Sequence, residues 1–107
     1  MKILLDECVT KHIKPYLSDY EIYTIREMEW SGIKNGKLMQ LCVEHSFDIL
    51  LTIDKNLQYQ QNLDRYSVVI VVLNSFTSKV DDLVVLLPSF RVQLQDFQKH
   101  KAYVINK

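Results

Sequence analysis

The strongest constraint on the fold is a run of six apolar residues at positions 68–73, which read VVIVVL. Branched side chains of this kind favour β-strands. A strand that is apolar on both sides fits a sheet that is covered on both faces. Residues 2–6 and 48–53 contain similar continuous apolar stretches. The sequence therefore predicts a buried sheet with helices on either side.

Helical patterns separate these strands. Residues 9–17 predict a short helix that begins after a capping residue, Thr10. Residues 35–45 predict an amphipathic helix. Between residues 80 and 97, apolar residues recur every three or four positions, which predicts one buried helical stripe. Pro88 lies within this stripe and predicts a kink or a break there.

Strand chemistry at residues 21–25 and 102–105 supplies two further strands. Strands that alternate with helices of about ten residues favour a mostly parallel sheet with right-handed crossovers. A chain of 107 residues is expected to form one domain. We therefore predict a single domain over residues 1–107. Its fold is α/β, three-layered and Rossmann-like, with a mostly parallel sheet of four or five strands flanked by helices.

The charge balance limits the classes of function. Thirteen basic residues balance thirteen acidic ones, so the formal net charge is zero. This balance excludes a general nucleic-acid coat, which carries a basic excess, but not a nuclease with a local basic rim. It is compatible with a partner protein or a homodimer. Neither a signal peptide nor a membrane span is expected, and Cys8 and Cys42 fit reduced thiols, so we predict a cytoplasmic protein.

Carboxylates stand at the ends of two predicted strands. Asp6 and Glu7 follow the first apolar run, and Asp54 follows the apolar run that ends at Ile53. In open α/β sheets, ligands bind beyond the carboxyl ends of the strands. Acids at neighbouring strand ends repel each other unless a cation lies between them. The expected cofactor is Mg²⁺ or Mn²⁺, because Mg²⁺ takes one or two carboxylates and keeps several waters. We predict Asp6 and Asp54 as the metal ligands.

The neighbouring residues allow more than one interpretation. An aspartate after a strand often caps the next helix, so Asp54 fits capping about as well as metal binding. Lys55 could hold a phosphate and Asn56 could bind metal or substrate, or both could be ordinary loop residues. The polar run at residues 58–62 could contact nucleobases or cover a partner surface. Cys8, beside two acids, is expected to have a raised thiol pKa, which argues against a nucleophile.

Three segments together resemble a known family. They are ILLDE at residues 3–7, WSGIKNG at residues 30–36, and LLTIDKNL at residues 50–57 followed by YQQNL at residues 59–63. In this order and spacing they are similar to PIN-like domains that are predicted to be toxin–antitoxin nucleases, distant relatives of the VapC toxins. The resemblance covers nearly the whole chain. It implies a three-layer fold around a parallel sheet, an acidic site for Mg²⁺ or Mn²⁺ that cleaves RNA, and an antitoxin protein as partner.

The resemblance also implies which residues form the site. The family's first-strand acid falls on Asp6, with Glu7 beside it, and the acid after the later strand falls on Asp54. Related domains have a further acid at the start of the middle helix, where this chain has Asn35, and many have another where it has Asn56. Fewer charges predict weaker cation binding. The predicted catalytic residues are therefore Asp6, Glu7 and Asp54, and the predicted substrate-binding residues are Lys55, Asn56 and Asn35.

The sequence leaves three functions to compare. The first is a metal-dependent ribonuclease that hydrolyses RNA phosphodiester bonds as the toxin of a toxin–antitoxin system. The second is a catalytically weak or inactive PIN-like module that binds RNA or a protein, which the missing acid of the middle helix and the zero net charge favour. The third is a receiver-type phosphoacceptor domain, which also has acids at strand ends. It is disfavoured because Asn74 and Ser75, rather than a lysine, follow the strand at residues 68–73.

Overall fold

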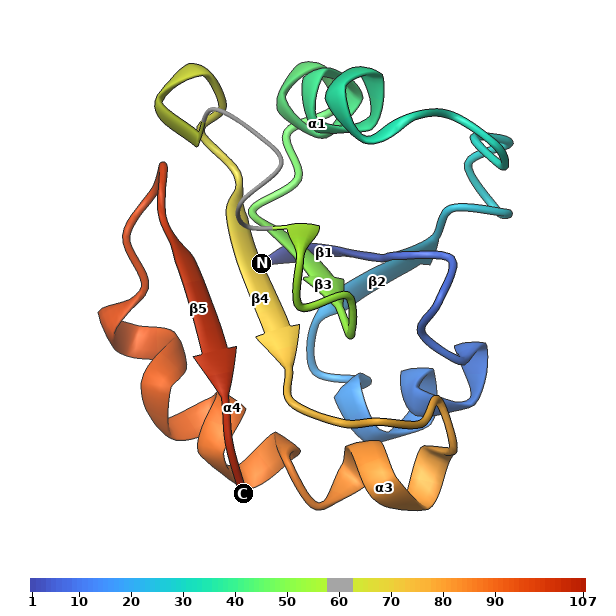
Figure 1. Ribbon diagram of the computed structural model, residues 1–107, viewed down its shortest axis with the longest axis vertical. Coiled ribbons are helices and arrows are strands. Elements are labelled where there is room, and N and C mark those ends of the chain that lie inside the picture. The colour runs from blue at the N-terminus through green and yellow to red at the C-terminus, as the bar shows by residue number, and fades with distance from the viewer. Residues whose placement is uncertain (58–62) are drawn as a thin grey trace.

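The computed structural model describes residues 1–57 and 63–107 (Figure 1). Five strands in this part of the chain form one sheet, and every neighbouring pair is parallel. The order across the sheet is β2-β1-β3-β4-β5. The predicted α/β fold is confirmed, and its sheet is wholly parallel. The strands are β1 (Lys2–Leu5), β2 (Glu21–Thr24), β3 (Ile49–Thr52), β4 (Val69–Leu73) and β5 (Ala102–Ile105).

The helices of the described residues comprise α-helices and short 3₁₀ helices. They are η1 (Lys11–Leu17), α1 (Asn35–Glu44), η2 (Leu63–Arg65), α3 (Val80–Val84), α4 (Leu87–Gln93) and η3 (Leu94–Asp96). None of them is long and apolar enough to cross a bilayer. Figure 1 shows α1 on the opposite side of the sheet from η1 and α3.

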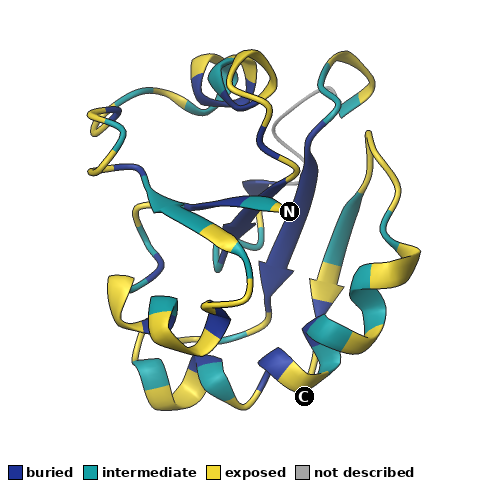
Figure 2. Ribbon diagram, turned by 180° about the vertical axis from the view of Figure 1, so that it is seen from behind, coloured by how far each residue is buried: buried dark blue, intermediate teal, exposed yellow. Residues whose placement is uncertain are grey.

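Two apolar cores lie on the two faces of the sheet. Alternate residues of a strand point to opposite faces, so Leu5 and Val71 join one core and Leu4 and Ile70 join the other. The first core is closed by η1, α3 and α4, and the second by α1 and the segments beside it. Every residue of β3 and β4 is buried, whereas the outer strands β2 and β5 are partly exposed (Figure 2). The molecule is therefore three-layered.

The predicted helical stripe at residues 80–97 is divided. Helix α3 ends at Val84, and α4 begins at Leu87 with Pro88 in its first turn. Proline is tolerated in a first turn because its missing N–H has no partner within the helix there. The break expected at Pro88 is confirmed.

The cap of the first helix is also as predicted. The Thr10 side chain accepts a hydrogen bond from the backbone N–H of His12, at 3.3 Å. The helix itself is of the tighter 3₁₀ kind and begins at Lys11. The short helix predicted at residues 55–63 lies largely outside the described residues.

One connection departs from the expected handedness. The chain crosses the sheet in one direction from β1 to β2 and in the opposite direction from β4 to β5. Nevertheless η1, α3 and α4 lie on the same face. The two connections therefore have opposite hands. The β2–β3 connection has the same hand as β1–β2, because it crosses in the opposite direction on the opposite face. Since nearly all such connections are right-handed, the β4–β5 connection is the left-handed one. Since η1 has only seven residues, α3 and α4 are needed to bury Ile49, Val69 and Val71 on this face.

Arg91 on α4 bonds to the last turn of η1 and to the segment that follows it. Its Nη1 donates to Asp19 Oδ2 at 2.6 Å, and its Nη2 donates to Asp19 Oδ1 at 3.1 Å and to the Tyr16 carbonyl at 2.7 Å. A guanidinium that bonds both oxygens of one carboxylate fixes its orientation as well as its distance. The hydrogen bonds from Arg91 lower the pKa of the Asp19 carboxyl.

Candidate functional site

Asp6 and Asp54 lie at the carboxyl ends of neighbouring strands. Asp6 follows β1 directly, and only Ile53 separates Asp54 from β3. The backbone N–H of Asp6 donates to the Leu51 carbonyl at 2.9 Å, so the pairing of β1 with β3 extends to Asp6. After β1 the chain turns toward η1, and after β3 it turns toward the opposite face, where Leu57 is buried. This edge is therefore the topological switch point at which open α/β sheets bind ligands.

Thr52 connects the two acidic segments. It is fully buried, and its hydroxyl donates to Asp6 Oδ2 at 2.8 Å. The same hydroxyl oxygen accepts from the backbone N–H of Asp54 at 3.0 Å and lies 3.4 Å from the Cys8 sulfur. The hydroxyl thus gives its one proton to Asp6 and uses one of its acceptor positions for Asp54. Sequence reasoning missed this residue, although it is the one polar residue in the apolar run at residues 49–53.

The carboxylates of Asp6 and Glu7 have different hydrogen-bond partners. Asp6 is half-buried: Oδ2 is held by Thr52 and Cys8, and Oδ1 accepts from the backbone N–H of Glu7 at 2.9 Å. Glu7 is exposed, and its Oε1 accepts from the backbone N–H of Gly32 at 2.8 Å. Gly32 has φ of +79°, a conformation that glycine adopts readily. The Glu7 carboxylate therefore anchors the loop before α1, while Asp6 faces β3.

Asp54 caps the turn that follows β3. Its Oδ1 accepts from the backbone N–H of Asn56 at 2.9 Å, which is the geometry of an N-cap. The capping interpretation of Asp54 is thus observed, and it uses one carboxylate oxygen. Lys55 turns away toward the loop after β4, where its Nζ donates to the Ser75 carbonyl at 2.9 Å.

The two asparagines predicted to bind substrate lie on different segments. Asn56 is exposed in the turn after β3, and Asn35 is the half-buried first residue of α1. Trp30, in the loop between β2 and α1, is largely buried, and its ring packs edge-on against Phe47 with centroids 5.9 Å apart. The loop tryptophan is therefore part of the core on the α1 face rather than a contact residue.

The cysteine at the site is a poor nucleophile. Burial raises the pKa of the Cys8 thiol, and the charge of Asp6 raises it further, although the hydrogen bond with Thr52 acts in the other direction. Cys42, on α1, is buried, and burial raises its pKa to about 12. Both cysteines are free thiols. The expected rise of the Cys8 pKa is confirmed, with burial as its main cause.

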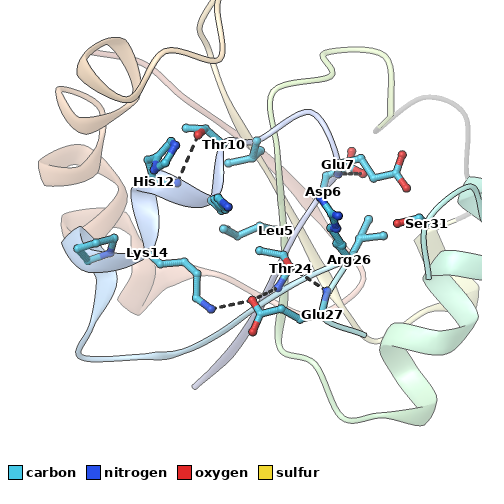
Figure 3. Close-up of a pocket in the computed structure, with 14 residues that line it drawn as sticks. Leu5, Asp6, Glu7, Thr10, His12, Lys14, Thr24, Arg26, Glu27 and Ser31 are labelled. Carbon is cyan, nitrogen blue, oxygen red and sulfur yellow. Dashed lines mark hydrogen bonds and ion pairs between the residues drawn. The ribbon is translucent and has the colours of Figure 1, made fainter. Parts of the chain in front are cut away.

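A groove of about 1030 Å³ adjoins Asp6 at the carboxyl ends of β1 and β2. Figure 3 shows Asp6, Glu7 and Ser31 at one end of it and Lys14 toward the other. Lys14 forms an ion pair with Glu27 at 2.7 Å. The remaining basic groups of its lining are Lys11, His12 and Arg26. The same lining contains the acids Asp6, Glu7 and Glu27, which balance the charges of Lys11, Lys14 and Arg26.

The donor set of this edge suits a weakly held, hydrated cation. Within residues 1–57 and 63–107, no three side chains among His, Cys, Asp and Glu are grouped as in a metal centre. Two carboxylates from adjacent strands, Asp6 and Asp54, supply hard oxygen ligands. Mg²⁺ commonly binds through one or two carboxylates and retains several waters. An ion bound here would have at most these two carboxylates, and Asp6 Oδ1, Asp6 Oδ2 and Asp54 Oδ1 already accept hydrogen bonds, so its affinity would be lower than at a site of three or four acids.

Replacing Thr52 with valine is expected to lower the free energy of unfolding by about 1–3 kcal/mol, because the Asp6 carboxylate and the Asp54 N–H lose a buried partner. Thr52→Ser is the matched control: it keeps the hydroxyl and removes one methyl group, which costs about 1 kcal/mol. Urea unfolding of the three proteins measures both effects. A valine variant more stable than the serine variant would contradict this account of Thr52.

In comparisons with known proteins, the chain matches no family model, no curated protein and no solved structure. The resemblance of its segments to PIN-like domains stays a prediction.

Proposed function

We propose that this protein is a metal-dependent endoribonuclease and the toxin of a toxin–antitoxin system. One observation carries the proposal: Asp6 and Asp54 extend from adjacent strands at the switch point, and the buried hydroxyl of Thr52 bonds both segments. Acids at this place in a parallel sheet suit a cation, and a cation suits a phosphodiester substrate. The resemblance of three segments to PIN-like domains supports the same conclusion.

Each residue of this edge has its own role in the proposed reaction. Asp6 and Asp54 would hold Mg²⁺ or Mn²⁺, which supplies an activated water and stabilises the charge that builds on a phosphate. Thr52 and Cys8 hold one oxygen of Asp6 and so fix the orientation of its carboxylate. Glu7 assists by fixing the loop at Gly32 over this edge.

The groove supports a polymeric substrate. It begins at Asp6 and Glu7 and extends over the end of β2, so that a chain bound in it would pass Asp6. Among the described residues, neither Lys11 nor Arg26 takes part in an ion pair. Cations at the rim of a groove attract a phosphate backbone without selecting its sequence.

Mn²⁺ is expected to raise the melting temperature of the parent protein and to start cleavage of a mixed RNA pool. A ligand that binds only the folded state, at about five times its Kd, stabilises the protein by about 1 kcal/mol. Differential scanning fluorimetry over a Mn²⁺ titration measures this shift. Asp54→Asn is the sharp control, since asparagine caps as well as aspartate and removes only the charge. A shift of equal size in the Asp54→Asn protein would place the ion elsewhere.

The second candidate is a PIN-like module that binds RNA or a protein without cleaving it. Asn35 and Asn56 favour it, because each stands where related domains carry an acid. The absence of a three-residue metal cluster from the described part of the chain favours it too. This candidate requires that Mn²⁺ change neither the melting temperature nor the RNA, so the same titration distinguishes the two.

The receiver-type phosphoacceptor domain stays the third interpretation, because Asn74 and Ser75, rather than a lysine, follow β4. The ribonuclease remains our proposal because three segments, and not only the acids at strand ends, resemble PIN-like domains.

A further inference from the structure

The ring of Phe76 is exposed to solvent at the carboxyl edge of the sheet. The side chain is 97% exposed, the highest value among the large apolar residues of the described chain. It lies in the loop between β4 and α3. Parallel strands end at one edge, so this loop starts from the same edge as Asp6 and Asp54. An aromatic ring at this place has no part in the core.

Lys55 connects the ring to the acidic segment. Its ammonium group lies 4.7 Å from the centroid of the Phe76 ring and donates to the carbonyl of the preceding residue, Ser75. Lys55 directly follows Asp54. The ring and a positive charge are therefore neighbours of the candidate metal ligand.

The loop that carries Phe76 is held by hydrogen bonds on both sides of the ring. Asn74 Nδ2 donates to Asn106 Oδ1 at 2.7 Å. Ser75 Oγ donates to the Thr77 carbonyl at 2.8 Å, and the Thr77 hydroxyl bonds to Asp82 on α3. A ring on an anchored loop loses little conformational entropy when a flat ligand binds to it.

We propose that Phe76 is a stacking platform for an unpaired nucleobase of the RNA substrate, with the charge of Lys55 beside it for the phosphate. The inference rests on the proposed ribonuclease function and specifies its substrate class as single-stranded RNA. Proteins that bind single strands combine positive charge with exposed aromatic rings, because every base has a face that can stack. Bases inside a duplex are already stacked on each other and cannot use the ring.

The order of the strands gives the bound RNA a direction. The groove lies at β2 and β1, the acids follow β1 and β3, and Phe76 follows β4. Neighbouring strands are about 4.8 Å apart, so these three features succeed one another along a single edge. A single strand that enters by the groove would reach the acids before the platform. In an RNA that occupies both the groove and the ring, a phosphate cleaved at the acids would lie between the two.

The test measures RNA binding without cleavage. Fluorescence anisotropy in EDTA follows a short, labelled single-stranded RNA of mixed sequence on four proteins: the parent, Phe76→Trp, Phe76→Leu and Val92→Ala. Leucine keeps an apolar side chain but no aromatic face, so Phe76→Leu is expected to weaken binding by about 5- to 150-fold. Phe76→Trp should bind at least as tightly as the parent. Val92, 71% exposed on α4, controls for an exposed apolar residue away from this edge.

Each outcome decides between the inference and the function on which it rests. The platform is overturned if the parent binds no RNA, or if Phe76→Leu binds RNA as tightly as the parent. Equal affinity of these two proteins is also the result expected if Phe76 contacts a protein partner. Equal affinity of the parent for a matched duplex overturns the single-strand assignment. Binding that depends on the aromatic ring, in a protein that cleaves no RNA with Mn²⁺, supports the platform and removes the ribonuclease.

Discussion

Replacing Asp6 with asparagine is expected to reduce Mn²⁺-dependent RNA cleavage by more than about 100-fold. Replacing a residue that only orients a metal ligand typically reduces activity by about 10- to 100-fold, and Asp6 is proposed as a ligand itself. The carboxylate charge is lost, but an amide oxygen can still accept the hydrogen bond from Thr52. The fold should therefore persist while the affinity for the ion falls. The measurement is the initial rate of cleavage of an RNA pool, with Mn²⁺ varied, for the parent and the variant.

Asp96→Asn is the control for this experiment. Asp96 is an exposed aspartate in η3, on the connection that leads into the amino end of β5, so it lies away from the carboxyl edge. Its replacement removes the same charge from the protein and should leave the cleavage rate unchanged. If Asp6→Asn cleaves RNA at the parent's rate, Asp6 is not part of the catalytic site. If both variants lose activity equally, the effect comes from net charge and not from the site.

The sequence predicted the sheet well because each strand carries its own signal. Residues 68–73 are apolar on both faces, and β4 is buried along its whole length. The positions of the acids were equally predictable, since a polar residue after an apolar run marks the end of a strand. Asp6 and Asp54 therefore fall at the carboxyl edge, as expected.

Other features depend on tertiary contacts that leave no local pattern. Helices α3 and α4 pack on the face that the short η1 covers only in part, which makes the β4–β5 connection left-handed. The apolar stripe of α3 and α4 predicts that they pack on the sheet but not on which face. The role of Thr52 required β1 and β3 to be neighbours. Glu7 was expected to be a catalytic residue. Its carboxylate instead accepts a hydrogen bond from Gly32 in the loop before α1, a contact between residues far apart in the sequence.

Replacing Phe90 with alanine is expected to lower the free energy of unfolding by about 3–5 kcal/mol, since the ring is fully buried and its loss leaves a cavity. The ring packs edge-on against Tyr20, with centroids 6.4 Å apart, and lies 6.1 Å from the Phe97 ring. A loss of this size is a large part of the total stability of about 5–15 kcal/mol for a domain. Urea unfolding with circular dichroism measures it.

Phe76→Ala is the matched control, because it removes the same ring from a site that is 97% exposed. Its unfolding free energy should stay within about 0.5 kcal/mol of the parent value, as for most surface substitutions. The contrast tests whether α4 covers the sheet through Phe90, which is buried in the core closed by η1, α3 and α4. If the two alanine variants were equally stable, α4 would not cover this face, and Val69 and Val71 would need another partner.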